Sequence, residues 1–399
     1  MKKIFAGLVV GLLLVLVASC GTNNPTGTAV LQKGPYMIYP ADNTKMNVLW
    51  ETDKIPAISK IAWGRDVSCV EGSANVTERV PTTTEAHEFL YALTGLATGV
   101  KYYFRVTIDG NSYIGSFTAA PPASATGVTF YYFADNQPML NPPDGFESVA
   151  ASLLRDMNKE ASKRQTILLQ GGDYVCRGRV DADWGAGFLN RNYPNITTLF
   201  GLLPILGAIG NHEYFNATGQ LDTTQPVAQI DRYLPFPYHA DYYYSFDYGP
   251  MHIAVIDTYT PFSRGSAQYR WLEEDLTNST KPWKIPLFHE PAWGNNNNNL
   301  TIEAELCPLF KRMDVKLVLQ AHIHDYCRCL VDGIQYVTLG AGGAPLNTSR
   351  GPAGSYDPTV IVKDAFVYSY GRFTIDGNTM NVTILDTSEG VVDSFSLTN

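Results

Sequence analysis

TILLQGGDYVCRG, at residues 166–178, is the stretch that decides the fold of this chain. The apolar run Ile167-Leu168-Leu169 stops at two glycines and a carboxylate. This is typical of a buried strand that ends abruptly with Asp173 at its carboxyl end. Open α/β sheets keep their ligands outside that end of their strands. Gly-Asp is also an ordinary turn pair, so this stretch alone does not distinguish a functional carboxylate from a turn. The residues at the ends of the other strands are needed for that distinction.

Four other predicted strands, at 128–133, 206–209, from about 284 onward and at 317–320, end in the same way. The residues at their ends are Asp135-Asn136-Gln137, Gly210-Asn211-His212-Glu213, His289 and Ala321-His322-Ile323-His324. Four of the seven histidines of the chain fall at these positions. Because the carboxyl ends of neighbouring strands border a single crevice, we expect one shared site of oxygen and imidazole ligands.

Two domains are expected, because 399 residues exceed what one hydrophobic core usually holds. Residues 31–118 contain about seven short alternating strands and no helical period, which predicts an all-β sandwich. Residues 119–127 have the composition of a linker. From 128 to 399, strands alternate with helical patterns at 146–163 and 268–276. We therefore expect an α/β domain with a mixed sheet or two packed sheets.

The segment LTGLATGVKYY at 93–103 resembles the signature of fibronectin type III domains. In that signature a tyrosine at the start of a strand closes a corner onto the preceding loop. The resemblance implies a fibronectin type III-like domain at 31–118, a kind of module that serves as a spacer or a binding platform. His87 lies in this region and is expected to be structural.

The N-terminus has the pattern of an export signal. Lys2 and Lys3 precede a short apolar segment that ends in Val17-Ala18-Ser19-Cys20. This ending resembles the lipobox of bacterial lipoproteins, in which the cysteine is acylated. The resemblance implies a signal peptide at 1–20, lipidation of Cys20 and a flexible tether at 21–30. The expected location is extracytoplasmic, anchored by lipid to the bacterial envelope on the periplasmic or cell-surface side of the outer membrane.

The formal net charge of −9, without any basic block, argues against a nucleic-acid partner. It does not argue against a phosphorylated small molecule, because bound metal ions supply positive charge locally. A homodimer formed through the N-terminal domain is compatible with the sequence, which leaves the oligomeric state open.

Taken in order, the strand ends resemble the motifs of the calcineurin-like metallophosphoesterase superfamily. Those motifs are D-x-[HQ], GD, GNH[DE], H and [GA]-H-x-H, and the resemblance covers about 128–345. The segments YYYSFDYGP at 242–250 and QYRWL at 268–272, together with the N-terminal domain, resemble the purple acid phosphatase branch. The implied fold of the second domain is an α-β-β-α sandwich.

This resemblance implies two metal ions, of Zn, Fe, Mn or a similar element, with Asp173 bridging them. The residues implied as ligands of one ion are Asp135, Gln137 and His324, and those of the other ion are Asn211, His289 and His322. A metal-bound hydroxide would then attack the phosphorus atom of the substrate.

Two further residues are predicted to contact the substrate. His212 occupies the position from which the family protonates the leaving oxygen or holds the phosphate, and imidazole suits that role. Arg177 matches an arginine that contacts phosphate in protein phosphatases, with a solvated loop arginine as the alternative. His252, inside an apolar strand, is expected to be a structural core histidine.

The chain departs from the family pattern at two positions. Cys176 stands where purple acid phosphatases place a metal-binding tyrosine and where protein phosphatases place an aspartate that supports the catalytic histidine. Tyr174, next to Asp173, should point elsewhere because neighbouring residues of an extended chain face opposite sides. Gln137 offers an amide oxygen in place of the imidazole of many relatives.

These observations lead to a binuclear metal-dependent phosphoesterase, with phosphomonoesters as its substrates, as the main hypothesis. Two alternatives stay open at this point. One is a phosphodiesterase or nucleotidase that uses the same site with different surrounding loops. The other is a surface-binding lipoprotein whose phosphatase domain has lost its activity.

Overall fold

The structure is a computed structural model that describes residues 27–79, 86–139, 142–159 and 165–399. The predicted signal peptide and Cys20 lie outside these residues. Within the described ranges, no helix is long and apolar enough to cross a membrane.

Seven strands form in the described part of residues 31–118, as the sequence predicts, and they belong to two sheets. Three of them are β1 (Leu31–Ile38), β2 (Met46–Thr52) and β5 (His87–Leu93). The other four are β3 (Ser59–Gly64), β4 (Gly72–Asn75), β6 (Lys101–Ile108) and β7 (Asn111–Thr118), in the order β4-β3-β6-β7. Alternate residues of β6 are buried, which is the pattern of a strand with one face on a core.

The segment at 93–103 contains the predicted corner. The Tyr102 hydroxyl, at the start of β6, accepts a hydrogen bond of 2.9 Å from the Ala97 backbone N–H. The Tyr102 ring is buried and stacks on Phe117, with 5.9 Å between the ring centroids.

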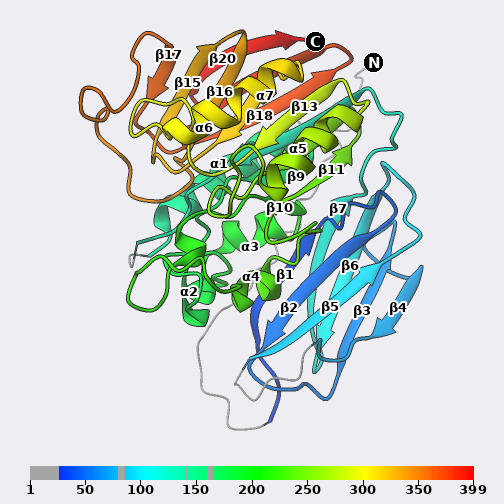
Figure 1. Ribbon diagram of the computed structural model, residues 1–399. Helices are drawn as coiled ribbons and strands as arrows, with labels where there is room; N and C mark the ends of the chain where they lie inside the picture. The colour runs from blue at the N-terminus through cyan, green and yellow to red at the C-terminus, as the bar shows by residue number, and fades with distance from the viewer. Residues whose placement is uncertain (1–26, 80–85, 140–141, 160–164) are drawn as a thin grey trace, which may run out of the picture.

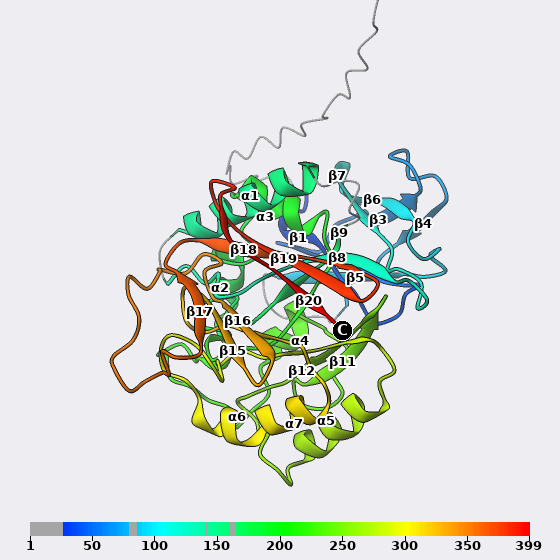
Figure 2. The ribbon, with the colours of Figure 1, turned by 90° about the horizontal axis from the view of Figure 1, so that it is seen from above.

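The rest of the chain forms two large sheets covered by helices on their outer sides (Figures 1 and 2). One face holds α1 (Asp144–Lys159) and α3 (Pro194–Phe200), and the other holds α5 (Ala267–Asn278), α6 (Leu300–Glu305) and α7 (Cys307–Arg312). Seen in Figure 2, the layers run helix, sheet, sheet, helix. The sheets are mixed, as expected.

The nine-stranded sheet has the order β20-β19-β18-β8-β9-β10-β1-β2-β5. Its strands beyond the N-terminal region are β8 (Gly127–Phe133), β9 (Gln165–Gln170), β10 (Ile205–Gly207), β18 (Ser369–Asp376), β19 (Thr379–Asp386) and β20 (Val391–Thr398). The pairs β8–β9 and β9–β10 are parallel, so their carboxyl ends point to one edge. Strand β1 extends the same sheet by pairing in parallel with β10 at Ile38 and Ile205.

The seven-stranded sheet has the order β11-β12-β13-β14-β16-β15-β17. Its strands are β11 (Tyr244–Tyr248), β12 (Met251–Val255), β13 (Trp283–Leu287), β14 (Leu317–Gln320), β15 (Tyr326–Val331), β16 (Ile334–Leu339) and β17 (Ile361–Ala365). Strands β12, β13, β14 and β16 are parallel neighbours. Figure 2 shows the two sheets face to face, so the strand ends of both sheets can line one site.

Most predicted elements exist with shifted ends. The predicted strand at 206–209 already ends at Gly207, because the chain turns there toward the Gly210 loop. The helix predicted at 146–163 begins two residues earlier, at Asp144, and its described part ends at Lys159. The short helices α2 (Asp181–Ala186), α3, α4 (Ala228–Tyr233), α6 and α7 have no counterpart in the prediction.

His252 is a buried structural residue, as predicted. Its side chain in β12 lies between two carboxylates, with Nδ1 2.9 Å from Asp247 Oδ1 and Nε2 2.7 Å from Asp275 Oδ2. Burial lowers the pKa of His252, but the hydrogen bonds to Asp247 and Asp275 outweigh this effect and raise it to about 9. The ring is therefore an imidazolium that joins β11, β12 and α5.

We expect this ion pair to make stability depend on pH. Because the pKa of His252 is about 9 in the fold, above its value of about 6.5 in an unfolded chain, its stabilisation is complete below pH 6.5 and disappears as the pH rises through 9. The difference in free energy of unfolding between wild type and His252→Gln should shrink by about 1–2 kcal/mol between pH 6 and pH 10.

Urea denaturation at both pH values measures this difference. His239→Gln is the matched control, because His239 lies on an exposed loop. A difference between wild type and His252→Gln that is equal at pH 6 and pH 10 would contradict the assignment of His252 as a charged partner of the two aspartates.

Candidate metal centre

The predicted ligands converge into two adjacent groups that share one carboxylate. Asp173, His289 and His322 form one group, and Asp135, Asp173 and His324 form the other, with the candidate ligand atoms of each group within 4.8 Å of one another. Asp135, Asp173 and His289 are at most 1% exposed. A buried cluster with a common carboxylate, two imidazoles on one side and one imidazole with a second carboxylate on the other is suited to hold two neighbouring metal ions.

Asn211 completes the first group. Its Oδ1 lies 3.1 Å from His289 Nε2 and 3.1 Å from His322 Nδ1, and these two nitrogens are 3.2 Å apart. Ligand atoms about 2.1 Å from a tetrahedral ion lie about 3.4 Å from each other, so these three atoms have nearly the spacing of a metal site.

Two histidines are oriented by main-chain carbonyls on the far side of their rings. His289 Nδ1 is 2.8 Å from the Gly171 carbonyl, and His324 Nδ1 is 2.9 Å from the Pro345 carbonyl. Since a carbonyl only accepts, each Nδ1 has to carry a proton, and each Nε2 faces the cluster, where its lone pair can bind a metal ion once any proton on it is displaced. This is the usual arrangement of metal-binding histidines.

Asp135 and Gln137 provide the second group with oxygen atoms. His324 Nε2 lies 3.6 Å from Asp135 Oδ1, and the Gln137 Nε2 lies 3.1 Å from Asp173 Oδ2. Asp135 Oδ1 and Gln137 Oε1 are buried and accept no hydrogen bond from the described residues. A cation would satisfy such oxygens, and a rotation of the Gln137 amide by half a turn would bring its oxygen into the cluster.

The backbone at three ligands is in the left-handed region. Asp135 and Asp173 have φ of +57° and His322 has φ of +69°. Residues other than glycine keep this conformation only where their surroundings enforce it, which is common at functional sites. Glycines make room beside them, because a Cβ on Gly210 would lie 2.2 Å from Asp173 Oδ1 and one on Gly340 would lie 2.8 Å from Asp135 Oδ2.

Glu213 has a role that the sequence does not reveal. Its buried carboxylate accepts hydrogen bonds from the backbone N–H groups of Asp173 at 2.8 Å, Tyr174 at 2.7 Å and Gly210 at 2.9 Å. It thus fastens the turn after β9 to the turn after β10. Burial and the nearby Asp173 carboxylate raise the pKa of Glu213 to about 8.

His212 is held over the shared carboxylate. Its backbone N–H donates to Asp173 Oδ1 at 2.9 Å, and its Nε2 lies 3.9 Å from Asp173 Oδ2. On the other side of the ring, Nδ1 is 2.7 Å from the Cys176 carbonyl. The absent aspartate at position 176 therefore does not leave His212 without support, because the main chain of Cys176 orients the ring instead.

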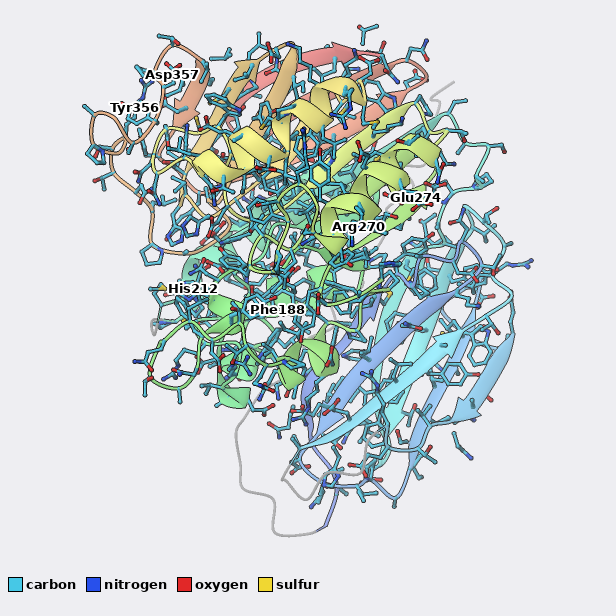
Figure 3. The ribbon with its side chains drawn as sticks, in the orientation of Figure 1. Phe188, His212, Arg270, Glu274, Tyr356 and Asp357 are labelled. Carbon is cyan, nitrogen blue, oxygen red and sulfur yellow. The ribbon has the colours of Figure 1, made fainter. Side chains whose placement is uncertain are left out.

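Tyr174 points away from the cluster, as predicted. Its ring is fully buried and packs edge-on against Phe188, with 5.0 Å between the ring centroids. Phe188 and His212 are labelled in Figure 3. The Tyr174 hydroxyl lies beside Gly207, where a Cβ would be 2.4 Å away. Tyr174 therefore belongs to the core beneath the site.

Arg177 is not brought to the ligand cluster. Its guanidinium forms a bidentate ion pair with Asp183 in α2, with two N–O distances of 2.9 Å, and its Nη1 donates to the Ala217 carbonyl. The Arg177 side chain is 31% exposed. Its contact with a phosphate group stays a prediction, and such a contact would require Arg177 to leave or share Asp183.

Tyr259 lies at the site although no sequence motif singles it out. Its hydroxyl is 3.4 Å from Asn211 Oδ1. Burial and the Glu290 carboxylate raise the pKa of Tyr259 well above its usual value, so the hydroxyl stays protonated. The available signal was Asp257-Thr258-Tyr259, which comes after β12 as the other polar groups come after their strands.

The cluster attracts positive charge. Burial raises the pKa of Asp135 well above its usual range. Burial acts in the same direction on Asp173, but His289 and His212 outweigh it and hold the pKa of Asp173 below the usual range. Burial lowers the pKa of His289, yet Asp173 and Asp135 raise it to about 10, while burial and the His289 charge lower that of His322 to about 3. A metal ion would compete with the His289 proton for the carboxylates.

Comparison with known proteins agrees with this geometry. The family model described as calcineurin-like phosphoesterase matches residues 129–326. The chain contains a calcineurin-like phosphoesterase domain. The five strand ends that provide the predicted ligands all lie within the matched residues. The match supports a phosphoric ester hydrolase.

Relatives of the phosphoesterase domain include purple acid phosphatases. One from Glycine max is 31% identical over 273 residues, which cover 63% of this chain and 55% of that protein, so the chain spans about half the length of this relative. The structure of purple acid phosphatase PPD1 from yellow lupin (Lupinus luteus) seeds has a TM-score of 0.73 at 17% identity, covering 93% of this chain and 74% of that one. A structure of PhoD has a TM-score of 0.64 at 14% identity, covering 92% and 90%. The two structures show a metallophosphatase fold.

We expect Gly210→Ala to disrupt metal binding in the phosphoesterase domain. The new Cβ would meet Asp173 Oδ1 at 2.2 Å, and the carboxylate would have to leave its position between the two groups. Elemental analysis of the purified variant should show less than about one ion per chain, with a stability loss of about 1–3 kcal/mol from overpacking. Gly201→Ala is the control, because its Cβ would meet Thr197 O at an ordinary 3.4 Å. Full metal content in Gly210→Ala would contradict the placement of Asp173.

Proposed function

We propose that this chain is a binuclear metal-dependent phosphoesterase that hydrolyses phosphomonoesters. The observation on which the proposal depends is that Asp173 belongs to both ligand groups, so two ions would lie side by side around one carboxylate. When bound, such ions neutralise phosphoryl oxygens and activate a water molecule. Asp135, Gln137, Asp173 and His324 would hold one ion, and Asp173, Asn211, His289 and His322 the other.

The residues of the chain support hydrolysis in distinct ways. His212, held by Asp173 and the Cys176 carbonyl, can present a protonated Nε2 toward the leaving oxygen. The P–O bond to that oxygen breaks while a bond from the water oxygen to phosphorus forms, and the proton of His212 moves to the leaving group. Tyr259 donates toward the Asn211 amide and fixes it for the cluster.

The completeness of the ligand set argues against a binding protein without activity. Gln137 is buried beside Asp173 and His324, so its amide stands among the other ligands. Cys176 supports His212 through its backbone, which any residue at this position would provide.

We also propose that residues 31–118 form a fibronectin type III-like domain, joined by residues 119–127 to the phosphoesterase domain at 128–399. The arrangement of three strands facing four and the corner at Tyr102 support this assignment. In this proposal β1 also serves the second domain, because it extends the sheet of β10.

Hydrolysis of an aryl phosphate with added Zn, Mn or Fe tests the function. Wild type should bind about two ions per chain and should hydrolyse p-nitrophenyl phosphate faster than bis(p-nitrophenyl) phosphate. The double variant Asp173→Asn, His212→Ala should lose about 10³-fold or more in kcat, and chelation of the metals should abolish turnover. His239→Ala, on an exposed loop, is the control. Wild-type activity no greater than that of the double variant, with metals bound, would refute the proposal.

We further propose that Cys20 anchors the protein to the bacterial envelope through its lipobox-like sequence. In a bacterial host, metabolic labelling with a fatty acid should mark wild type, which should sediment with membranes. Cys20→Ser should lose both the label and the sedimentation, whereas Ser19→Ala should keep them. Labelling of Cys20→Ser at the wild-type level would exclude this anchor.

A further inference from the structure

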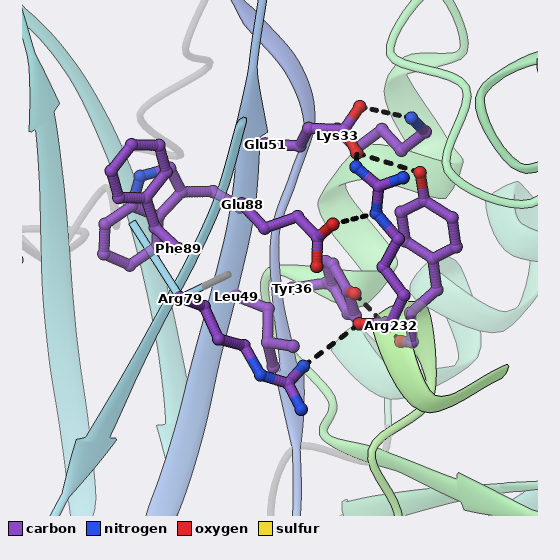
Figure 4. Close-up of a pocket in the computed structure, with 10 residues that line it drawn as sticks. Lys33, Tyr36, Leu49, Glu51, Arg79, Glu88, Phe89 and Arg232 are labelled. Carbon is purple, nitrogen blue, oxygen red and sulfur yellow. Dashed lines mark hydrogen bonds and ion pairs between the residues drawn. The ribbon is translucent and has the colours of Figure 1, made fainter. Parts of the chain in front are cut away.

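A buried charge network joins the N-terminal strands to the phosphoesterase domain. Lys33 in β1, Glu51 in β2 and Glu88 in β5 are each at most 7% exposed. They meet Arg232 in α4, which pairs with both Glu51 and Glu88 (Figure 4). Lys33 pairs with Glu51. Removing one partner from such a network leaves a buried charge uncompensated, so the network resists separation of the two parts.

Tyr233 connects this network to α2. Its hydroxyl lies 2.9 Å from Glu51 Oε2 and 2.7 Å from Oδ1 of Asp181. Asp181 is the first residue of α2. Arg232 Nη1 reaches the same Asp181 oxygen at 2.9 Å. Arg79 also joins the network, because it donates to the carbonyls of Asp231 and Arg232. The three cations Lys33, Arg79 and Arg232 thus match the three carboxylates Glu51, Glu88 and Asp181 in number.

The network leaves no room for a ligand. The side chains around Glu51, Glu88 and Arg232 enclose a cavity of about 10 Å³, enough for one water molecule at most. The role of the charge network therefore depends on the residues that α2 contacts.

The other side of α2 holds the loop that supports His212. Asp183 forms the bidentate pair with Arg177, and Trp184 Nε1 donates to the Gly178 carbonyl at 2.9 Å. The Gly178 N–H donates to the His212 carbonyl at 2.8 Å, and Cys176 in the same loop accepts from His212 Nδ1. Helix α2 thus lies between the charge network and the segment 176–178 that orients the His212 ring.

We propose that Glu51, Arg232 and Tyr233 are positioning residues for the phosphoester hydrolysis proposed above, on which this inference rests. They fix α2, and α2 fixes segment 176–178, so the N-terminal strands help to set the direction of the His212 proton donor. In this proposal the N-terminal strands contribute to catalysis through the orientation of His212.

The test compares two substrates that differ in their need for a proton. Phenyl phosphate has a poor leaving group that needs protonation, whereas 2,4-dinitrophenyl phosphate releases a stable anion. Tyr233→Phe removes only the hydroxyl between Glu51 and Asp181. We expect a kcat about tenfold lower on phenyl phosphate, a change within about twofold on the dinitrophenyl ester, and little change in KM. Glu51→Gln should show the same asymmetry, more strongly.

Tyr131→Phe is the matched control, because it removes a buried hydroxyl bonded to Asp156 at 2.6 Å on the side of α1. It should leave the ratio of the two substrates unchanged. Destabilisation or partial unfolding lowers both activities equally, so an equal loss, or no loss, in Tyr233→Phe overturns the inference. If Glu51→Gln fails to fold, Tyr233→Phe alone decides. Failure of wild type to hydrolyse either substrate would instead refute the proposed function.

Discussion

Two aspartates buried at the meeting point of two sheets impose the main constraint on this structure. Asp135 and Asp173 are 0% and 1% exposed, and burying carboxylates is costly unless positive charge and hydrogen bonds surround them. The N–H groups of His322 and His212 point at them, and His289 lies between them. These contacts require left-handed backbone at the strand ends, where the turns after β8, β9 and β14 bring main-chain donors to the carboxylates.

Glu213 is a third buried acidic residue beside Asp135 and Asp173, and main-chain donors surround it. Its carboxyl group accepts hydrogen bonds from the backbone N–H groups of Asp173, Tyr174 and Gly210, which offset part of the cost of its burial. Because the donors come from the ends of two neighbouring strands, Glu213 stabilises the relative position of those ends. The spacing of the candidate metal ligands thus depends on a residue that belongs to neither ligand group.

The sequence predicts most of the strand ends and the ligand set because these signals are local. An apolar run with Gly-Asp, or with Gly-Asn-His, directly after it marks a strand and its polar end within about ten residues, and β9 and β14 form where expected. The roles of Glu213 and Tyr259 could not be predicted in this way, because each depends on which loops meet in space. The support of His212 by Cys176 comes from a carbonyl group, which side-chain identity does not encode.

The sequence predicts that the N-terminal strands form an independent domain, because their contacts with the rest of the chain are long-range and local patterns do not reveal them. In the fold they are not independent. Their alternating pattern predicts a separate sandwich, yet β1 pairs with β10 of the phosphoesterase domain. Lys33 and Glu51, which a free sandwich would expose to water, are buried against α2 and α4. Separating such a buried pair from its partners would leave an uncompensated charge, which opposes movement at the joint. The joint is therefore continuous with β10 and β9, the strands that precede His212 and Asp173 in the chain.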